Sequence, residues 1–316
     1  MPAPKRFWIL LAFAAVYLIW GSTYLGIRFA IASIPPLLMA GSRFFLAGLI
    51  MFAIARIQGP VRSTWHDWRT SFIVGACLLL GGNGGVTLSE KYIDSGLAAV
   101  VVAMVPIYIA LLSWFTRMSP RPPPIVWLGL FGGFAGVAIL LGPEFRFSAD
   151  GSRATVTGIS ILLASSFIWS AGSLYSRASN HGGSPFLACA QQMICGGGLM
   201  LVIGIVIAKP GQFDPSNVSA LSLGAFIYLV LIGAIVGYTA YVFLLRHCDP
   251  AKVATYAYVN PVVAVFLGAT FAGESLNGRT GLGAGLIIAS VALVIMAQKI
   301  KPKRSLSTGE AVECIR

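Results

Sequence analysis

Ten apolar segments, each of about 20 residues, constrain the fold of this chain more than any other feature of its sequence. A helix rises about 1.5 Å per residue, so about 20 residues cross about 30 Å of lipid hydrocarbon. Lipid offers the backbone no hydrogen-bond partners, so each spanning segment must be helical. We expect helices over residues 7–28, 36–57, 70–90, 95–116, 124–142, 157–179, 185–208, 220–246, 250–272 and 277–298.

The composition agrees with a chain that has the bilayer as part of its solvent. Apolar residues make up 57% of the sequence and charged residues only 10%, against about 25% charged residues in soluble domains. The run 7–27 follows Lys5-Arg6 and resembles a secretory signal, but it is longer than the apolar core of such signals. We therefore interpret it as a retained first helix of an all-α integral membrane protein with ten transmembrane helices.

Lysine and arginine in short loops predict the orientation. With the N-terminus inside, inside segments carry fifteen of the 22 basic residues, outside segments carry six, and Arg43 lies within a predicted helix. This bias predicts that both termini are cytoplasmic, which requires an even number of helices. The basic residues lie between apolar blocks, so the net charge of +12 does not indicate binding to nucleic acid.

Marker residues recur at equal spacing in the two halves of the chain. One pair of markers is eight residues apart in both halves, and a second pair is twelve residues apart in both halves. The first pair recurs after 149 residues and the second pair after 155 residues. The corresponding markers are Trp20/Arg28 with Trp169/Arg177, and Asp94/Pro106 with Asp249/Pro261. We expect repeats over residues 1–148 and 149–298, followed by a disordered basic cytoplasmic tail at 299–316. Five helices per repeat is an odd number, so the second repeat is predicted to be inverted, as in alternating-access transporters.

Three segments resemble the EamA family of the drug/metabolite transporter superfamily. They are WGSTYLGIRFAI at 20–31, PPLLMAGSRFFLAG at 35–48 and YVNPVVAVFLGATFAGESL at 258–276. The resemblance implies a bacterial inner-membrane protein of ten helices, with a central cavity lined by the first, third and fourth helices of each repeat. It also implies export of small metabolites such as amino acids, and the nearest type within the family exports aromatic amino acids. One departure is Thr116-Arg117-Met118, which stands at the end of the fourth helix where the ninth helix has Gly273-Glu274.

Aromatic and amide side chains inside the predicted helices are the candidates for binding substrate. Trp20 and Trp169 occupy repeat-related positions near the middle of their segments, and Tyr238 is the approximate counterpart of Asn83. Each of these side chains has packing within the bundle as its alternative role. The residues that we expect to bind substrate are Trp20, Tyr24, Asn83, Met104, Tyr108, Trp169, Tyr238, Thr255, Tyr258 and Asn260.

Arg43 and two prolines are further candidates. Arg43 is predicted either to contact a substrate carboxylate or to extend to the nearby membrane interface, and its repeat counterpart is Gln192. Pro106 and Pro261 are predicted to break the fourth and ninth helices and to serve in gating. Asn260 has a second possible role, which is to satisfy the backbone that Pro261 interrupts.

The positions of the acidic residues bear on mechanism. All ten lie in loops, in the tail or at helix ends, whereas proton relays commonly use carboxylates inside the membrane. We therefore expect a facilitator or exchanger, with a proton-coupled multidrug or metabolite efflux pump as the alternative. No catalytic constellation, metal site or cofactor motif is evident, so the expected partners are a small-molecule substrate and membrane lipid. The glycines between Gly129 and Gly136 leave dimerisation or internal packing open, and we expect a monomer.

Overall fold

The computed structural model describes residues 6–59, 63–89, 92, 101–141, 153–179, 184–207, 213–271 and 278–297, and these are helical with no strand among them. Six helical runs within this part of the chain are long and apolar enough to cross a membrane. They are Arg6–Ile31, Pro36–Gln58, Trp65–Ser89, Val156–Ala178, Pro185–Ile207 and Ala220–His247. Shorter apolar helices accompany them, so the all-helical membrane fold is confirmed. The predicted tail at 299–316 lies outside the described residues.

The described residues of the first half form a series of helices. Their elements are α1 (Arg6–Ile31), α2 (Pro36–Gln58), α3 (Trp65–Gly75), the π-helical η1 (Ala76–Gly84), α4 (Gly85–Ser89), α6 (Val105–Phe115) and α7 (Pro124–Leu141). Pro36 opens α2, where its missing N–H would have no helical partner. Thr64 and Asp67 form a reciprocal capping box that starts α3. α3, η1 and α4 follow one another without a gap, as the predicted third helix requires.

The second half repeats this order. Its elements are α8 (Arg153–Ala178), α9 (Pro185–Ile207), the short η3 (Pro215–Asn217), α10 (Ala220–Tyr228), the π-helical η4 (Leu229–Tyr238), α11 (Thr239–His247), α12 (Pro250–Val253), α13 (Tyr256–Phe271) and α14 (Gly278–Ala297). The Ser219 side chain accepts from the Ser222 N–H and starts α10. Asp249 caps α12 in the same way, at 2.9 Å from the Ala251 nitrogen. A π-helical segment therefore occurs in the third helix of both halves.

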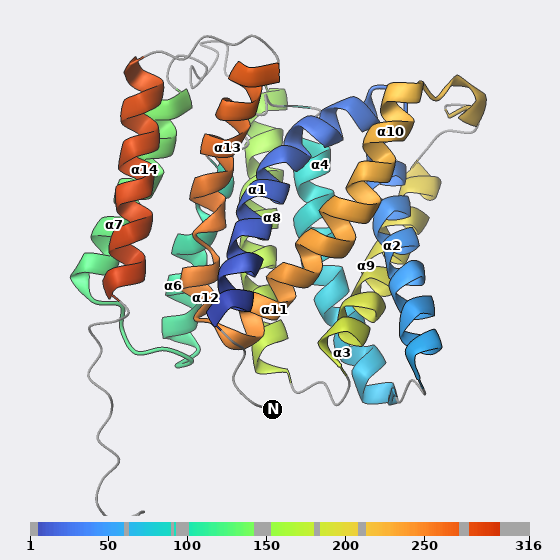
Figure 1. The fold of residues 1–316 in the computed structure, drawn as a ribbon, viewed down its shortest axis with the longest axis horizontal. Helices are drawn as coiled ribbons and strands as arrows, with labels where there is room; N and C mark the ends of the chain where they lie inside the picture. The colour runs from blue at the N-terminus through green and yellow to red at the C-terminus, as the bar shows by residue number, and fades with distance from the viewer. Residues whose placement is uncertain are drawn as a thin grey trace, which may run out of the picture.

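The two halves are interleaved rather than side by side. α1 packs against η4 and α13 of the second half, while α8 packs against η1 and α6 of the first half. Figure 1 shows α7 and α14 together at one edge of the bundle and α2 and α9 together at the other, and both pairs are in extensive contact. A side chain added at Gly129 would meet Val294, and one added at Gly136 would meet Ile287. The glycines of α7 therefore pack within the bundle, as one of the two interpretations predicted.

The helix breaks lie before the two prolines and not at them. α13 continues through Pro261, and the break falls at Ala254–Thr255. Pro106 sits in the first turn of α6, after a turn at Ala103–Met104. The fourth helix is therefore interrupted just before Pro106, as predicted, whereas the prediction that Pro261 breaks the ninth helix is wrong. A proline removes only one backbone donor, and in a first turn that donor has no helical partner anyway.

Candidate functional site

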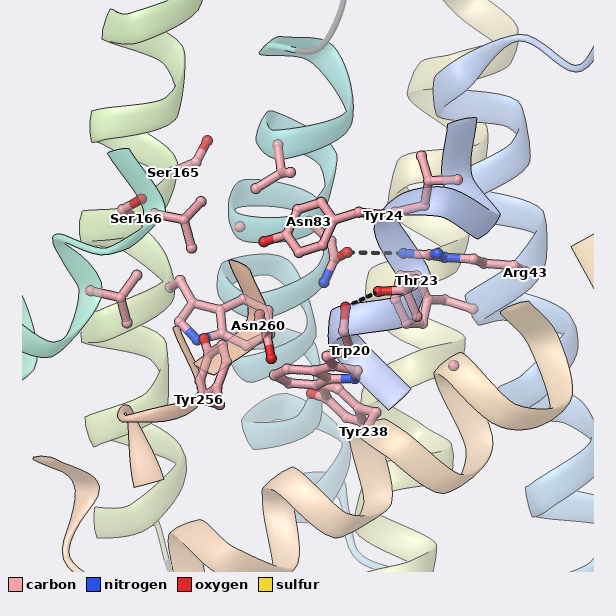
Figure 2. A pocket seen from close by; sticks show the side chains of 18 residues that line it. Trp20, Thr23, Tyr24, Arg43, Asn83, Ser165, Ser166, Tyr238, Tyr256 and Asn260 are labelled. Atoms are coloured by element: carbon pink, nitrogen blue, oxygen red, sulfur yellow. Dashed lines mark hydrogen bonds between the residues drawn. The ribbon is translucent and has the colours of Figure 1, made fainter. Parts of the chain in front are cut away.

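A cavity lies between the two halves of the chain. Its walls come from α1, α2, η1 and α4 of the first half and from α8, η4 and α13 of the second, with further residues at and just before the start of α6. The lining residues are Trp20, Thr23, Tyr24, Ile27, Arg43, Phe44, Gly82, Asn83, Val86, Val102, Val105, Ser165, Ser166, Trp169, Gly233, Tyr238, Tyr256 and Asn260. Figure 2 shows their side chains.

Aromatic rings close one end of this cavity. The Trp20 ring lies 5.7 Å from the Trp169 ring and 4.9 Å from both the Tyr241 and the Tyr256 rings, centroid to centroid. The Tyr241 hydroxyl accepts from Trp169 Nε1 at 3.0 Å and shares a 2.6 Å hydrogen bond with Ser173 Oγ. Tyr241 is fully buried. The cluster is therefore a packed and hydrogen-bonded layer beneath the cavity.

Two glycines allow the tryptophans to reach this layer. Trp20 lies against Gly237 of η4, where an added Cβ would be 2.6 Å from Nε1 of its indole. Trp169 lies against Gly82 of η1, where an added Cβ would be 2.5 Å from its ring. A side chain at either glycine would overlap the indole. Each first helix thus approaches the π-helical segment of the other half at repeat-related positions, and such segments often occur at functional sites.

Arg43 forms the polar side of the cavity. It is 3% exposed, and its Nη2 donates to Asn83 Oδ1 at 2.9 Å. Its guanidinium carbon also lies 4.4 Å from the centre of the Phe44 ring. Figure 2 shows Arg43 reaching across from α2 toward Asn83. The alternative in which Arg43 extends to the membrane interface is therefore wrong. Among the described lining residues, Arg43 is the one charged side chain.

The second half has a neutral pair at the equivalent place. Tyr238 donates from its hydroxyl to Gln192 Oε1 at 2.9 Å, and both side chains are buried. Gln192 is the repeat counterpart of Arg43, and Tyr238 is the counterpart of Asn83. Both halves thus join the second helix to the third by one hydrogen bond, but only the first half places a cation there. The cavity is electrically asymmetric for this reason.

Seven of the predicted residues line the cavity, and four do not. Those that line it are Trp20, Tyr24, Arg43, Asn83, Trp169, Tyr238 and Asn260. The structure places Met104, Tyr108, Thr255 and Tyr258 elsewhere. Met104 packs against a separate apolar cluster, and the Tyr108 ring lies 5.7 Å from Phe167. These two residues belong to the fourth helix, whose residues Val102 and Val105 face the cavity instead.

Thr255 and Tyr258 are held by packing contacts. Thr255 donates to the Lys252 carbonyl at 2.7 Å and bonds the Tyr17 hydroxyl at 2.6 Å. Tyr258 donates to the Leu130 carbonyl at 3.0 Å, on the side of α13 that faces α7. Tyr256 and Tyr258 are two positions apart in α13 and therefore lie on different faces of this helix, and Tyr256 is the one that lines the cavity.

Several lining residues were not predicted, although helical spacing points to some of them. Ser165 and Ser166 precede Trp169 by about one turn, and Thr23 follows Trp20 by three residues. Residues at these spacings share a helix face, so the two tryptophans could have identified them. Tyr256 precedes Asn260 by one turn and could have been found in the same way. Phe44 has no comparable signal, because its exposure to the cavity depends on how neighbouring helices pack.

Nothing in the described residues suggests a metal centre, since no group of three or more His, Cys, Asp or Glu side chains converges among them. The cavity offers one guanidinium, two amides, three phenols and further aromatic rings. Such a lining can hold a small organic molecule by charge, hydrogen bonds and apolar contact. A helical membrane protein with an interior cavity between two similar halves fits the class of small-molecule transporters.

Comparison with known proteins gives the family. Residues 6–142 and residues 156–296 each match the EamA-like transporter family. The chain therefore belongs to this family and is a membrane transporter built from two EamA units. It is 35% identical over 295 residues to the Escherichia coli K12 protein named "Uncharacterized inner membrane transporter YedA", covering 93% of this chain and 92% of that one.

Two further similarities extend the comparison. The chain is 25% identical over 287 residues to an Escherichia coli K12 protein named "Probable amino-acid metabolite efflux pump", covering 86% of this chain and 90% of that one. A crystal structure with 20% sequence identity superimposes with a TM-score of 0.76, covering 94% of this chain and all of that one. The last similarity supports the fold alone.

Proposed function

We propose that this protein exports amino acids with neutral or aromatic side chains across the inner membrane. The observation that carries the proposal is Arg43, a single buried cation in a cavity otherwise lined by aromatic, aliphatic and uncharged polar groups. A guanidinium suits a carboxylate, and the aromatic layer suits an apolar body. The similarity to a protein named as an amino-acid metabolite efflux pump supports the same substrate class.

We further propose that the two halves are inverted five-helix repeats that work by alternating access. Ten helices then cross the membrane, with both termini in the cytoplasm, and one chain is the working unit. The reciprocal packing of α1 on η4 and of α8 on η1 supports a two-fold relation between the halves. Substrate binds at their interface, where the first helices meet. Rocking of one half against the other exposes the cavity to each side in turn.

The proposed mechanism is facilitated diffusion or exchange. No carboxylate is among the described residues that line the cavity, and a carboxylate is the group that commonly carries a coupled proton. An uncoupled carrier follows the gradient of its substrate, so export in the cell reflects a higher concentration inside.

Transport by purified protein in liposomes tests this function. Uptake of labelled phenylalanine is measured with and without an imposed pH gradient, and empty liposomes serve as the control. The expected result is saturable uptake that ends at equal concentrations inside and outside in both conditions. Accumulation driven by the pH gradient would overturn the uncoupled mechanism and favour a proton-coupled pump. Absence of uptake by folded protein, for phenylalanine and for other neutral amino acids, would overturn the substrate class.

A further inference from the structure

Asn260 Oδ1 and Ser166 Oγ are buried polar atoms of the cavity wall that have no hydrogen-bond partner among the described residues. Asn260 is 2% exposed and lines the cavity, and its Oδ1 accepts no hydrogen bond from any described residue. Buried side-chain oxygens are nearly always hydrogen-bonded, because burial removes them from water. An unpartnered acceptor in a cavity wall therefore suits a donor that a ligand brings.

The surroundings of Asn260 define what kind of donor can reach it. Asn260 follows Tyr256 by one turn of α13, so both side chains face the same way. The Tyr256 ring packs edge to face against Trp20, with centroids 4.9 Å apart. Figure 2 shows Asn260 close to these two rings, with Arg43 entering from another side of the cavity. The acceptor thus stands beside the aromatic layer, away from the cation.

Pro261, the residue after Asn260, does not account for the unpartnered Oδ1 of the Asn260 amide. Pro261 leaves the Ala257 carbonyl without its helical donor. A carbonyl needs a donor, and in an asparagine side chain the donor is Nδ2, so a bond from Nδ2 to this carbonyl would still leave Oδ1 without a partner. The neighbouring polar side chain Thr255, in contrast, is satisfied locally by the Lys252 carbonyl. Asn260 is therefore a polar group of α13 that faces the cavity with its acceptor open.

We infer that Asn260 selects amino acids whose side chain ends in a hydrogen-bond donor. Arg43 takes the carboxylate, the aromatic layer takes the ring, and Asn260 Oδ1 accepts from a phenol O–H or an indole N–H. Tyrosine and tryptophan then bind more tightly than phenylalanine, which would bury the amide oxygen without a partner. This inference rests on the proposed function, and it adds the side-chain class that the site prefers.

Matched substrates test the inference on the unaltered protein. Competition against labelled tryptophan uptake is measured in liposomes for tyrosine and phenylalanine, which differ by one hydroxyl, and for tryptophan and 1-methyltryptophan, which differ by one donor. We expect the donor-bearing member of each pair to compete about tenfold more strongly. Equal competition within both pairs, alongside transport of tryptophan, would overturn the inference and leave the proposed function standing. Absence of transport of any amino acid would overturn both.

Substitutions at Asn260 assign the preference to this residue. Asn260→Leu keeps the approximate size and removes the acceptor, so the preference for tyrosine over phenylalanine should disappear and the ratio of their affinities should approach one. Asn260→Asp keeps an acceptor and should retain the preference for tyrosine. Thr255→Val is the control, because it removes a polar group of the same region that does not face the cavity. An equal loss for both substrates in Asn260→Leu, with the ratio unchanged, would contradict the assignment.

Discussion

The indole rings of Trp20 and Trp169 meet edge to face with their centroids 5.7 Å apart. The two residues are 149 positions apart in the sequence and occupy equivalent places in the two halves. Each ring also packs on a glycine of the opposite half, Gly237 for Trp20 and Gly82 for Trp169. The point where the halves join is therefore also the closed end of the cavity, so packing there affects both stability and transport.

Substitution of either glycine tests this arrangement. Gly82→Ala and Gly237→Ala place a methyl group 2.5 Å and 2.6 Å, respectively, from an indole atom and should each lower stability by about 1–3 kcal/mol. Thermal unfolding of the purified protein in detergent measures the effect. Gly224→Ala is the control, because an added Cβ there meets nothing within 4 Å, and it should be neutral or stabilising. Stability of Gly82→Ala equal to that of the control would show that the rings are not held at these distances.

Arg43 provides a test of carboxylate binding. Arg43→Gln introduces the side chain that the second half has at the equivalent position, and it removes the only charge among the described lining residues. Competition by phenylalanine should weaken about tenfold or more, because a hydrogen bond to a charged group is lost. Competition by phenethylamine, which lacks the carboxylate, should stay unchanged. Equal weakening for both compounds would indicate that Arg43 only supports the fold.

Arg43→Lys separates charge from geometry. Lysine keeps the positive charge but has no planar fork, so it cannot hold Asn83 and a carboxylate in the same way. We expect phenylalanine to bind this variant more weakly than wild type and more tightly than Arg43→Gln. Uptake assays in liposomes rank the three proteins, and an order with lysine below glutamine would contradict a carboxylate contact.

The hydroxyl of Tyr241 connects two helices of the second half beneath the cavity. Tyr241→Phe leaves Trp169 Nε1 and Ser173 Oγ without this partner. The expected loss of stability is about 1–3 kcal/mol, since a buried N–H is left unpaired. Tyr175→Phe is the matched control, because Tyr175 is 38% exposed. Thermal unfolding that is equally affected in both variants would contradict the role of this hydrogen-bonded layer.

Tyr258 and Tyr238 distinguish packing from substrate contact. Tyr258→Phe removes a hydrogen bond to the Leu130 carbonyl outside the cavity, so stability should fall by about 1 kcal/mol while the KM for substrate stays unchanged. Tyr238→Phe makes the same chemical change in the cavity wall and should alter the KM. Transport kinetics and thermal unfolding are measured on both. A raised KM in Tyr258→Phe alone would contradict the described cavity.

The helices were predictable because their physical cause is local. The helix expected over residues 36–57 is observed at Pro36–Gln58, and the helix expected over residues 185–208 is observed at Pro185–Ile207. A segment of this length and apolarity has no other stable conformation in lipid. The repeat also directed attention correctly to Trp20 and Trp169, since symmetry-related aromatic residues on first helices meet at the interface between the halves.

The cavity wall was less predictable because it depends on helix rotation. Tyr258 and Tyr256 differ by two positions, yet only Tyr256 lines the cavity. Helical spacing does show that Tyr256 shares a face with Asn260 and that Tyr258 does not. Which of these faces points inward is decided by packing, including the contact of α13 with α7. Ser166 and Thr23 could have been found from their spacing to the tryptophans, whereas Phe44 could not.

The sequence by itself determined that this chain is a helical membrane protein with two similar halves, because hydropathy and marker spacing are properties of single segments. It also placed a lone arginine inside the second helix. Only the tertiary structure decided that Arg43 lies against Asn83, that Tyr238 lies against Gln192, and that α1 and α8 exchange partners between the halves. These contacts join residues far apart in the chain, and their geometry follows from close packing of whole helices, which no local pattern encodes.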